Sequence, residues 1–186
     1  ILPRSMKSFL AFIWEIAKIV IIALLIVVPI RYFLFQPFFV RGQSMEPNFE
    51  NGDYLIIDEI SYRLRDPQRG EVVVFKYPQN PSQHYIKRVI GLPGETVEIK
   101  DGKVIILNQE GSQVLNESEY LPLDISTPGE VEATLAEDEY FVLGDNRYAS
   151  ADSRRWGSLP RKDIIGRVFL RGWPFTVLAK FEAPAY

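Results

Sequence analysis

The stretch Thr96-Val97-Glu98-Ile99-Lys100-Asp101-Gly102-Lys103-Val104-Ile105-Ile106-Leu107 decides the fold class of this 186-residue chain. Valine or isoleucine recurs at every second position on each side of Asp101-Gly102, and this is the period of a half-buried strand. An Asp-Gly pair between two such runs favours a two-residue hairpin turn. The stretch therefore predicts a β-hairpin that pairs Ile99 with Val104 and Val97 with Ile106 on one face.

Short runs rich in Val, Ile, Phe or Tyr lie on both sides of this hairpin, and glycines and prolines separate them. We expect strands at Asp53–Ile57, Glu71–Phe75, Tyr85–Ile90, Tyr140–Leu143 and Gly166–Leu170. Sustained helical periodicity is scarce from residue 38 onward, so the fold class that we expect is mostly β, with an antiparallel sheet. The acidic residues 108–139 contain several turn formers and predict a long loop or small insertion.

Composition limits what the chain can do. A hydrophobic content of 47% in 186 residues suits one domain with a sizeable core plus an appendage. The formal net charge of −3 argues against nucleic acid as the main partner. The chain has no cysteine and a single histidine, His84, so the usual zinc, iron-sulfur and haem ligand sets cannot form. We expect neither a metal nor another cofactor.

The N-terminal region contains twelve uncharged residues from Ile19 to Ile30. Alone they would make about 18 Å of helix, which is shorter than the roughly 30 Å of a hydrocarbon core. Extension back to Ser8 makes a helix long enough to span, at the cost of including Glu15 and Lys18, which are neighbours on one helical face. We predict a cytoplasmic tail at 1–7, a transmembrane anchor and juxtamembrane segment at 8–34, and an extracytoplasmic catalytic domain at 35–186.

The apolar run has two competing interpretations. A cleavable signal peptide would fit Arg4 and Lys7 before the run, but bulky residues follow Ile30 where a processing site would need small ones. A buried core helix is disfavoured because so continuous an apolar run has no polar face. Arg4 and Lys7 favour a cytoplasmic N-terminus.

Ser44 is a candidate nucleophile just beyond this segment, within Gly42-Gln43-Ser44-Met45-Glu46-Pro47. A serine hydroxyl needs a positioned base to take its proton. His84 and Lys87 are candidates in one expected strand, and because side chains alternate between faces they cannot both point into one site. The choice is between a Ser-His-Asp triad and a Ser-Lys dyad.

The local sequence favours lysine as the base. Lys87 lies in the largely apolar run Tyr85-Ile86-Lys87-Arg88-Val89-Ile90, whereas His84 follows the polar residues 80–83. A free lysine is almost fully protonated at neutral pH, and burial lowers its pKa toward the range in which the amine can accept a proton.

Four motifs in this order resemble those of the type I signal peptidases, or leader peptidases, which are membrane-bound serine-lysine endopeptidases. The first is the segment around Ser44, and the second is Arg69-Gly70-Glu71-Val72-Val73-Val74-Phe75. The third runs from Tyr85 through Lys87 to Gly91-Leu92-Pro93-Gly94-Glu95. The fourth is Gly144-Asp145-Asn146-Arg147, continuing through Ser150-Ala151-Asp152-Ser153-Arg154 to Trp156-Gly157. The resemblance covers nearly the whole chain.

This resemblance implies a role for particular residues. Ser44 would be the nucleophile and Lys87 the general base, and Ser150 would hydrogen-bond the lysine amine. Asp152 would pair with Arg154 as support. The backbone N–H of Ser44 would donate to the oxyanion. Some family members add a serine hydroxyl at the position of Gly42, which has none here.

The resemblance also implies the substrate. Signal peptides carry small residues at the first and third positions before the cut, which shallow apolar pockets select, and alternate residues of an extended substrate face one wall. The expected wall consists of Phe38, Val40, Met45, Phe49, Leu55, Val74, Tyr85 and Ile86. We expect Phe49 to narrow the first pocket, and we expect the substrate to add as a strand against Phe38–Arg41 and Tyr85–Lys87.

The resemblance thus implies the function of a type I signal peptidase, that is, a Ser-Lys hydrolase that removes signal peptides from exported preproteins after small-x-small sites. The expected location is the extracytoplasmic face of a bacterial plasma membrane or an equivalent organellar membrane, so the lipid bilayer is a partner. A catalytically inactive membrane-anchored β-domain protein is the alternative. A self-cleaving repressor-type protein would share Ser-Lys chemistry, but the chain shows neither a DNA-binding head nor an Ala-Gly cleavage link.

Overall fold

The computed structural model describes residues 4–33, 35–173, 179–180 and 184. The chain divides into two units, residues 1–36 and 37–186. The first unit contains the helix α1 (Arg4–Phe33) and the start of strand β1 (Phe35–Phe39). The remaining elements, in chain order, are β2 (Tyr54–Asp58), α2 (Ser61–Leu64), β3 (Val72–Tyr77), β4 (Asn80–Gly91), β5 (Thr96–Lys100), β6 (Lys103–Asn108), β7 (Gly111–Val114), β8 (Val131–Thr134), β9 (Glu139–Leu143), α3 (Ser153–Trp156), β10 (Leu159–Pro160), the 3-10 helix η1 (Arg161–Asp163), β11 (Ile164–Trp173) and β12 (Ala179–Lys180).

The large sheet has the strand order β1-β2-β11-β3-β4-β9-β10, with β12 paired to β11. The described pairings of β2, β3, β4, β9, β10, β11 and β12 in this sheet are antiparallel. All five predicted strands outside the hairpin are present, and β4 and β11 extend several residues beyond their predicted bounds. The mostly β, antiparallel fold class is therefore confirmed.

Strand β3 shows why the middle of this sheet has a continuous apolar sequence. Val72 and Val74 face one hydrophobic cluster together with Leu55. Val73 and Phe75 face a second cluster. Because both faces of the strand are covered, there is no polar alternation, and a short uninterrupted apolar run is typical of such a strand.

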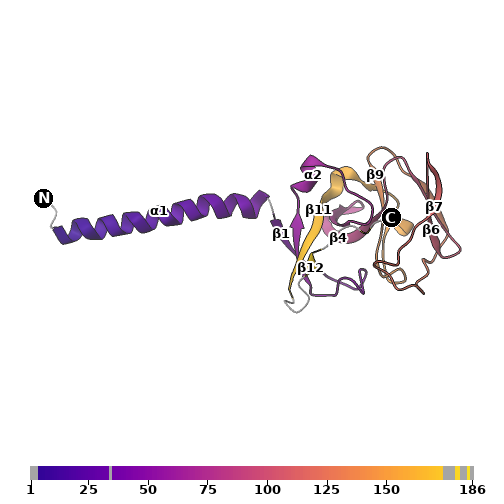
Figure 1. Ribbon diagram of the computed structural model, residues 1–186, viewed down its shortest axis with the longest axis horizontal. Helices are drawn as coiled ribbons and strands as arrows, with labels where there is room; N and C mark the ends of the chain where they lie inside the picture. The colour runs from indigo at the N-terminus through magenta and orange to yellow at the C-terminus, as the bar shows by residue number, and fades with distance from the viewer. Residues whose placement is uncertain (1–3, 34, 174–178, 181–183, 185–186) are drawn as a thin grey trace. The chain divides into compact units, whose positions relative to one another are not determined.

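The hairpin of β5 and β6 forms in the predicted register, with Ile99 opposite Val104 and Val97 opposite Ile106. The turn residues Asp101 and Gly102 have φ values of 51° and 75°, which glycine and aspartate tolerate better than most residues. The hairpin is the centre of a second sheet with the order β7-β6-β5-β8. This sheet lies at the end of the second unit away from β11 (Figure 1).

Residues 108–139, predicted to be a long loop or small insertion, contain the short strands β7 and β8. All four residues of β7 are exposed, and those of β8 alternate between half-buried and exposed. β7 therefore lacks the apolar alternation that predicts a strand, whereas in β8 the alternation is limited to Val131 and Ala133, which pack half-buried against a core cluster. Backbone pairing with β6 and β5 also holds the two strands.

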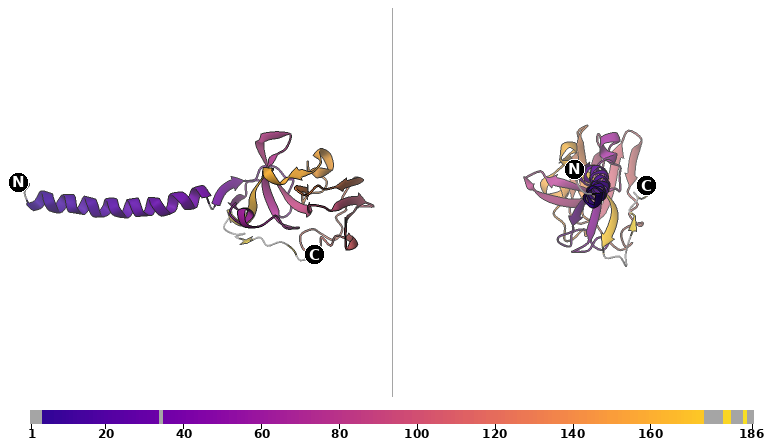
Figure 2. Two further views of the ribbon diagram at one scale, coloured as in Figure 1. Left: turned by 90° about the horizontal axis from the view of Figure 1, so that it is seen from above. Right: turned by 90° about the vertical axis from the view of Figure 1, so that its left-hand side faces the viewer.

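Helix α1 is continuous from Arg4 to Phe33, as the left view of Figure 2 shows. Its described large apolar side chains, among them Phe12, Trp14 and Leu25, are exposed, and Lys18 forms an ion pair with Glu15 at 2.7 Å. Within the described residues, no helix meets the length and apolarity required to cross a membrane. The predicted transmembrane span is therefore not confirmed.

Candidate active site

Ser44 lies in the loop between β1 and β2, and hydrogen bonds within the loop and buried side chains beneath it fix its conformation. The backbone N–H of Phe49 donates to the carbonyl of Met45 at 2.9 Å, and the N–H of Glu46 donates to the carbonyl of Gln43 at 3.2 Å. The side chains of Met45 and Phe49 are fully buried in the core beneath the loop. This anchoring leaves the half-buried Ser44 side chain at the surface of a cavity.

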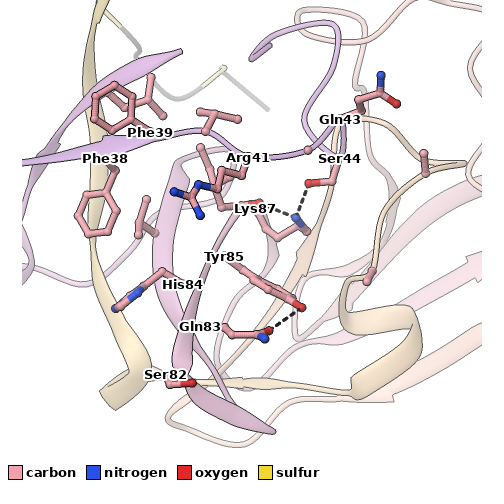
Figure 3. Close-up of a pocket in the computed structure, with 17 residues that line it drawn as sticks. Phe38, Phe39, Arg41, Gln43, Ser44, Ser82, Gln83, His84, Tyr85 and Lys87 are labelled. Carbon is pink, nitrogen blue, oxygen red and sulfur yellow. Dashed lines mark hydrogen bonds between the residues drawn. The ribbon is translucent and has the colours of Figure 1, made fainter. Parts of the chain in front are cut away.

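Lys87 reaches Ser44 from strand β4. Its Nζ donates to Ser44 Oγ at 2.7 Å and to the carbonyl of Ile86 at 2.6 Å (Figure 3). Lys87 is 3% exposed. Burial lowers the pKa of its ammonium group from 10.5 to about 8, while the charges of Asp152 and Asp145 act in the opposite direction. The amine is thus poised for proton exchange near neutral pH.

His84 does not share this orientation, although it lines the same cavity. Figure 3 shows its ring turned away from Ser44 toward Phe38, and the two ring centroids are 5.8 Å apart. His84 is exposed, and Lys87 is buried. The expected separation of these two side chains along the strand is therefore observed, and the structure brings Lys87 and not His84 into contact with Ser44.

The cavity beside Ser44 has a volume of about 670 Å³. Among its lining residues are six of the eight residues expected to form the substrate wall: Phe38, Val40, Leu55, Val74, Tyr85 and Ile86. Val40, Leu55 and Val74 form an apolar floor, because they are also members of the buried core.

Met45 and Phe49, which the sequence analysis assigns to the substrate wall, lie in the buried core. They are 1% and 0% exposed and are not among the described residues that line the cavity. Phe49 packs in the core with the guanidinium of Arg171 5.4 Å from the centre of its ring. The expected narrowing of the first pocket by Phe49 is therefore not supported.

Phe39 and Arg41 lie in the segment expected to pair with the substrate, but sequence reasoning missed other lining residues, namely Gln43, Ser82, Gln83, Ala149 and Ala151. The two alanines lie in the fourth motif, next to Ser150, and their small size in that position was the available signal. The described lining contains Arg41, His84 and Lys87 but no aspartate or glutamate. The cavity therefore has a positive charge balance in a chain whose net charge is −3.

Ser150 does not make the bond expected of it. Its buried Oγ has no hydrogen-bond partner of acceptable geometry among the described residues, and Lys87 donates to Ser44 and Ile86 instead. Ser150 nevertheless lies very close to the site, because a Cβ placed on Gly144 would collide with Ser150 Oγ and with the carbonyl of Ser44. The absence of a side chain at Gly144 allows these two segments to approach each other.

Asp152 and Arg154 form the expected ion pair. Arg154 Nε donates to Asp152 Oδ1 at 2.8 Å and Arg154 Nη2 donates to Oδ2 at 2.8 Å. The fully buried carboxylate also accepts from the backbone N–H of Gly144 at 3.0 Å. Burial raises the pKa of Asp152, but these hydrogen bonds, the Arg154 charge and the nearby Ser150 hydroxyl outweigh it and hold the pKa below its usual value.

Gly42 precedes the nucleophile by two residues and has φ of 91°, a conformation that glycine adopts easily. Its backbone N–H donates to Asn51 Oδ1 at 2.9 Å. In the part of the chain that the structure describes, no three His, Cys, Asp or Glu side chains are grouped so that they could hold a metal ion. The chemistry that the site offers is that of a hydroxyl group beside a buried amine.

Comparison with known proteins gives a consistent assignment. Residues 13–173 match the family described as signal peptidase, peptidase S26. A probable signal peptidase I-2 of Synechocystis sp. is 39% identical over 165 residues, which cover 86% of this chain and 73% of that protein. A signal peptidase I of Leptolyngbya laminosa is 39% identical over 191 residues, with 98% and 88% coverage.

Among solved structures, a signal peptidase I from Enterococcus faecalis is 33% identical. It matches with a TM-score of 0.46 and covers 56% of this chain and 97% of its own. The family match extends over most of the described residues and includes all four motifs. This chain therefore belongs to the signal peptidase family, peptidase S26, and is a serine endopeptidase.

Proposed function

We propose that this protein removes signal peptides from preproteins by endoproteolysis, with Ser44 as the nucleophile and Lys87 as the general base. The observation that carries the proposal is the 2.7 Å contact between Lys87 Nζ and Ser44 Oγ at the surface of a cavity. The lowered pKa of Lys87 supports the role of a base, because a neutral amine is required to accept the hydroxyl proton.

The reaction is acyl transfer in two stages. Lys87 takes the proton of Ser44 as Oγ attacks the scissile carbonyl carbon, and the backbone N–H of Ser44 donates to the developing oxyanion. The carbon–nitrogen bond then breaks, and the proton held by Lys87 passes to the leaving amine of the mature protein. Water deprotonated by Lys87 next attacks the ester, releases the signal peptide as a carboxylic acid and returns the proton to Ser44.

The cavity suits small-x-small substrates. Its apolar floor of Val40, Leu55 and Val74 is shallow enough, in this proposal, to accept alanine-sized side chains and exclude larger ones. Strand β4 pairs with β3 through residues 80–88, whereas its pairing with β9 begins at Arg88. Among the described strands, the second edge of residues 82–87 has no partner, so an extended substrate can add there through backbone hydrogen bonds.

Residues 150, 152 and 154 act as support in this proposal. The ion pair of Asp152 with Arg154 fixes the loop that contains Ser150. Ser150 Oγ is buried and makes no well-formed hydrogen bond to a described residue, so a rotation of either side chain during the reaction would let it bond the Lys87 amine as the family resemblance implies. Asp152 and Arg154 do not contact the reacting atoms.

We further propose that residues 8–34 anchor the chain in a membrane, with residues 1–7 in the cytoplasm and residues 35–186 on the extracytoplasmic side. The support comes from the twelve uncharged residues Ile19–Ile30 and from the exposed apolar side chains of α1. Full-length protein should resist extraction from vesicles at alkaline pH, and protease added outside should remove only the short tail or only the large domain. Release into solution would contradict the anchor.

The decisive experiment is cleavage of a preprotein with an Ala-x-Ala site in detergent. Ser44→Ala and Lys87→Ala should each lower kcat/KM by at least about 10³-fold, because the nucleophile or its base is missing. Lys76→Ala is the matched control, since Lys76 is an exposed lysine on the neighbouring strand β3. His84→Ala should remain active.

Loss of activity with His84→Ala but not with Lys87→Ala would reverse the assignment of the base. Failure of the wild-type protein to cleave, with Ser44→Ala indistinguishable from it, would favour the inactive anchored β-domain protein instead.

A further inference from the structure

A tight turn at residues 117–121, here named the Glu117 turn, lies in the acidic segment between β7 and β8. The backbone N–H groups of Tyr120 and Leu121 both donate to the carbonyl of Glu117, at 3.2 and 2.9 Å. Tyr120 Oη donates to Glu117 Oε1 at 2.6 Å. Tyr120 and Leu121 are buried, so this part of the segment is packed into the domain and is not a solvated loop.

The Glu117 turn binds the loop of the fourth motif through Arg147. Both terminal nitrogens of Arg147 donate to the two carboxylate oxygens of Glu117, and Arg147 Nε donates to the carbonyl of Gly144 at 3.1 Å. Arg147 is 1% exposed, so this ion pair is shielded from water. The preceding residue, Asn146, donates from its backbone N–H to the carbonyl of Ser44 at 3.1 Å.

The same turn contacts the strand of the proposed base. The guanidinium of Arg88, the residue that follows Lys87, lies 4.0 Å from the centre of the Tyr120 ring. A guanidinium over an aromatic face at this distance is attracted by the ring, most strongly where water is excluded. Arg88 also donates to both carboxylate oxygens of Asp145, at 2.8 and 2.6 Å, which links β4 to the fourth motif.

A third contact joins the turn to the loop of the nucleophile. The side-chain nitrogen of Asn48, four residues after Ser44, donates to the carbonyl of Tyr120 and to Asp145 Oδ2, both at 2.8 Å. The turn thus contacts residues near Ser44, Lys87 and Ser150 in sequence, which come from three separate segments of the chain. None of the turn residues is among the described residues that line the cavity.

We propose that the Glu117 turn is a positioning element for the active site, and that Glu117 and Tyr120 are positioning residues that hold Ser44, Lys87 and Ser150 in register through Asn48, Arg88 and Arg147. This inference rests on the proposed Ser-Lys chemistry. The acidic segment 108–139, which the sequence predicts to be a long loop or small insertion, therefore contributes to the rate of reaction without touching the substrate.

The expected effect follows from geometry. A displacement of about 1 Å in a reacting group costs up to about 100-fold in rate, even when its cause lies away from the reacting atoms. If β4 and the Ser44 loop lose their common support, the amine moves away from Oγ and toward water. Burial is the largest effect on the pKa of Lys87 and lowers it, whereas the charges of Asp152 and Asp145 raise it, so the loss of burial raises the pKa of Lys87.

The test compares Glu117→Gln with Glu119→Gln in the full chain, on an uncharged Ala-x-Ala peptide substrate. Glu119 is an exposed carboxylate in the same turn, so its variant removes the same charge without breaking the ion pair. We expect Glu117→Gln to lower kcat by about 10- to 100-fold with KM within about twofold of wild type. The pH at half-maximal kcat/KM should also rise, and Glu119→Gln should change neither value.

Folding must be separated from positioning. Tyr120→Phe keeps the ring under Arg88 and removes only the hydroxyl bond to Glu117, so it should fold and show a smaller loss of kcat in the same direction. The acyl-enzyme burst counts the competent Ser44 sites in each preparation.

The proposal is overturned if the loss in Glu117→Gln matches a smaller burst at unchanged kinetic pKa, or if Glu119→Gln gives the same loss. If Ser44→Ala cleaves the substrate as fast as the wild type, the Ser-Lys chemistry itself is refuted. The two failures are therefore distinguishable.

Discussion

The two faces of strand β4 each contain a buried cationic side chain, and the surroundings of these two side chains differ. Lys87 and Arg88 are adjacent and are 3% and 5% exposed. Arg88 has a carboxylate partner in Asp145, whose side chain is fully buried, and it also donates to the carbonyl of Gly70. The described hydrogen bonds of Lys87 go to a hydroxyl and a carbonyl group. Arg88 is thus part of a buried ion pair, whereas burial lowers the pKa of Lys87, the proposed base.

Removal of Arg88, the paired cation, should have the largest effect on the free energy of unfolding. Arg88→Met leaves the Asp145 carboxylate buried without its main partner, and the free energy of unfolding should fall by about 3–5 kcal/mol. Urea denaturation at pH 7 measures it. Arg155→Met is the control, since Arg155 is exposed, and should change stability by less than about 0.5 kcal/mol. A loss under about 1 kcal/mol in Arg88→Met would remove the contrast between the two faces.

Removal of Lys87, which has no carboxylate partner among its described hydrogen bonds, should have the opposite effect on stability. At neutral pH the folded protein keeps a proton on Lys87 against the cost of burial, since the pKa is lowered from 10.5 to about 8. Lys87→Met should therefore raise the free energy of unfolding by about 1–3 kcal/mol while abolishing activity. Denaturation of the variant beside the wild type checks this, and destabilisation would show that the amine is well compensated.

The same shift gives a pH dependence with a defined sign. Between pH 8 and 10.5 the unfolded chain carries a proton on this lysine that the folded chain has lost, so wild-type stability relative to Lys87→Met should rise across this window. Below pH 8, kcat/KM should increase about tenfold per pH unit as the neutral amine forms, and it should level off above. A flat profile from about pH 6 to 10, with chemistry rate-limiting, would contradict the lowered pKa.

Substitution of Ser150 should have the smallest effect on stability of the changes considered, apart from the control. Its hydroxyl is buried beside the site without a well-formed hydrogen bond in the described structure, so Ser150→Ala should change the free energy of unfolding by less than about 1 kcal/mol. A loss of about 2 kcal/mol or more would indicate a hydrogen bond in solution. Activity measured alongside reports separately whether the hydroxyl bonds Lys87 during the reaction.

Local physical chemistry explains which parts of the fold were predictable. Asp101-Gly102 determined the register of β5 with β6, because the turn and the apolar alternation agree. Strand β7 was missed because it buries no face, and β8 because its apolar alternation is limited to the two half-buried residues Val131 and Ala133. Their place depends on an existing hairpin edge, which is a property of the folded domain.

The candidate site was predictable only in part for a similar reason. The contact between Ser44 and Lys87 spans 43 residues, and spacing alone left His84 as a rival base. Apolar neighbours favoured Lys87 because they indicated burial. Met45 and Phe49 show the limit, since an apolar residue beside a cavity can face either the cavity or the core, and the sequence does not say which.

Gly144 has a consequence for protein engineering. It occupies a narrow gap between the Ser44 loop and Ser150, and even a methyl group there would displace both. Mutational libraries that aim at new cleavage specificity should therefore vary the cavity wall and leave position 144 unchanged. At that position the size of an introduced side chain, and not its polarity or charge, will decide whether the substitution is tolerated.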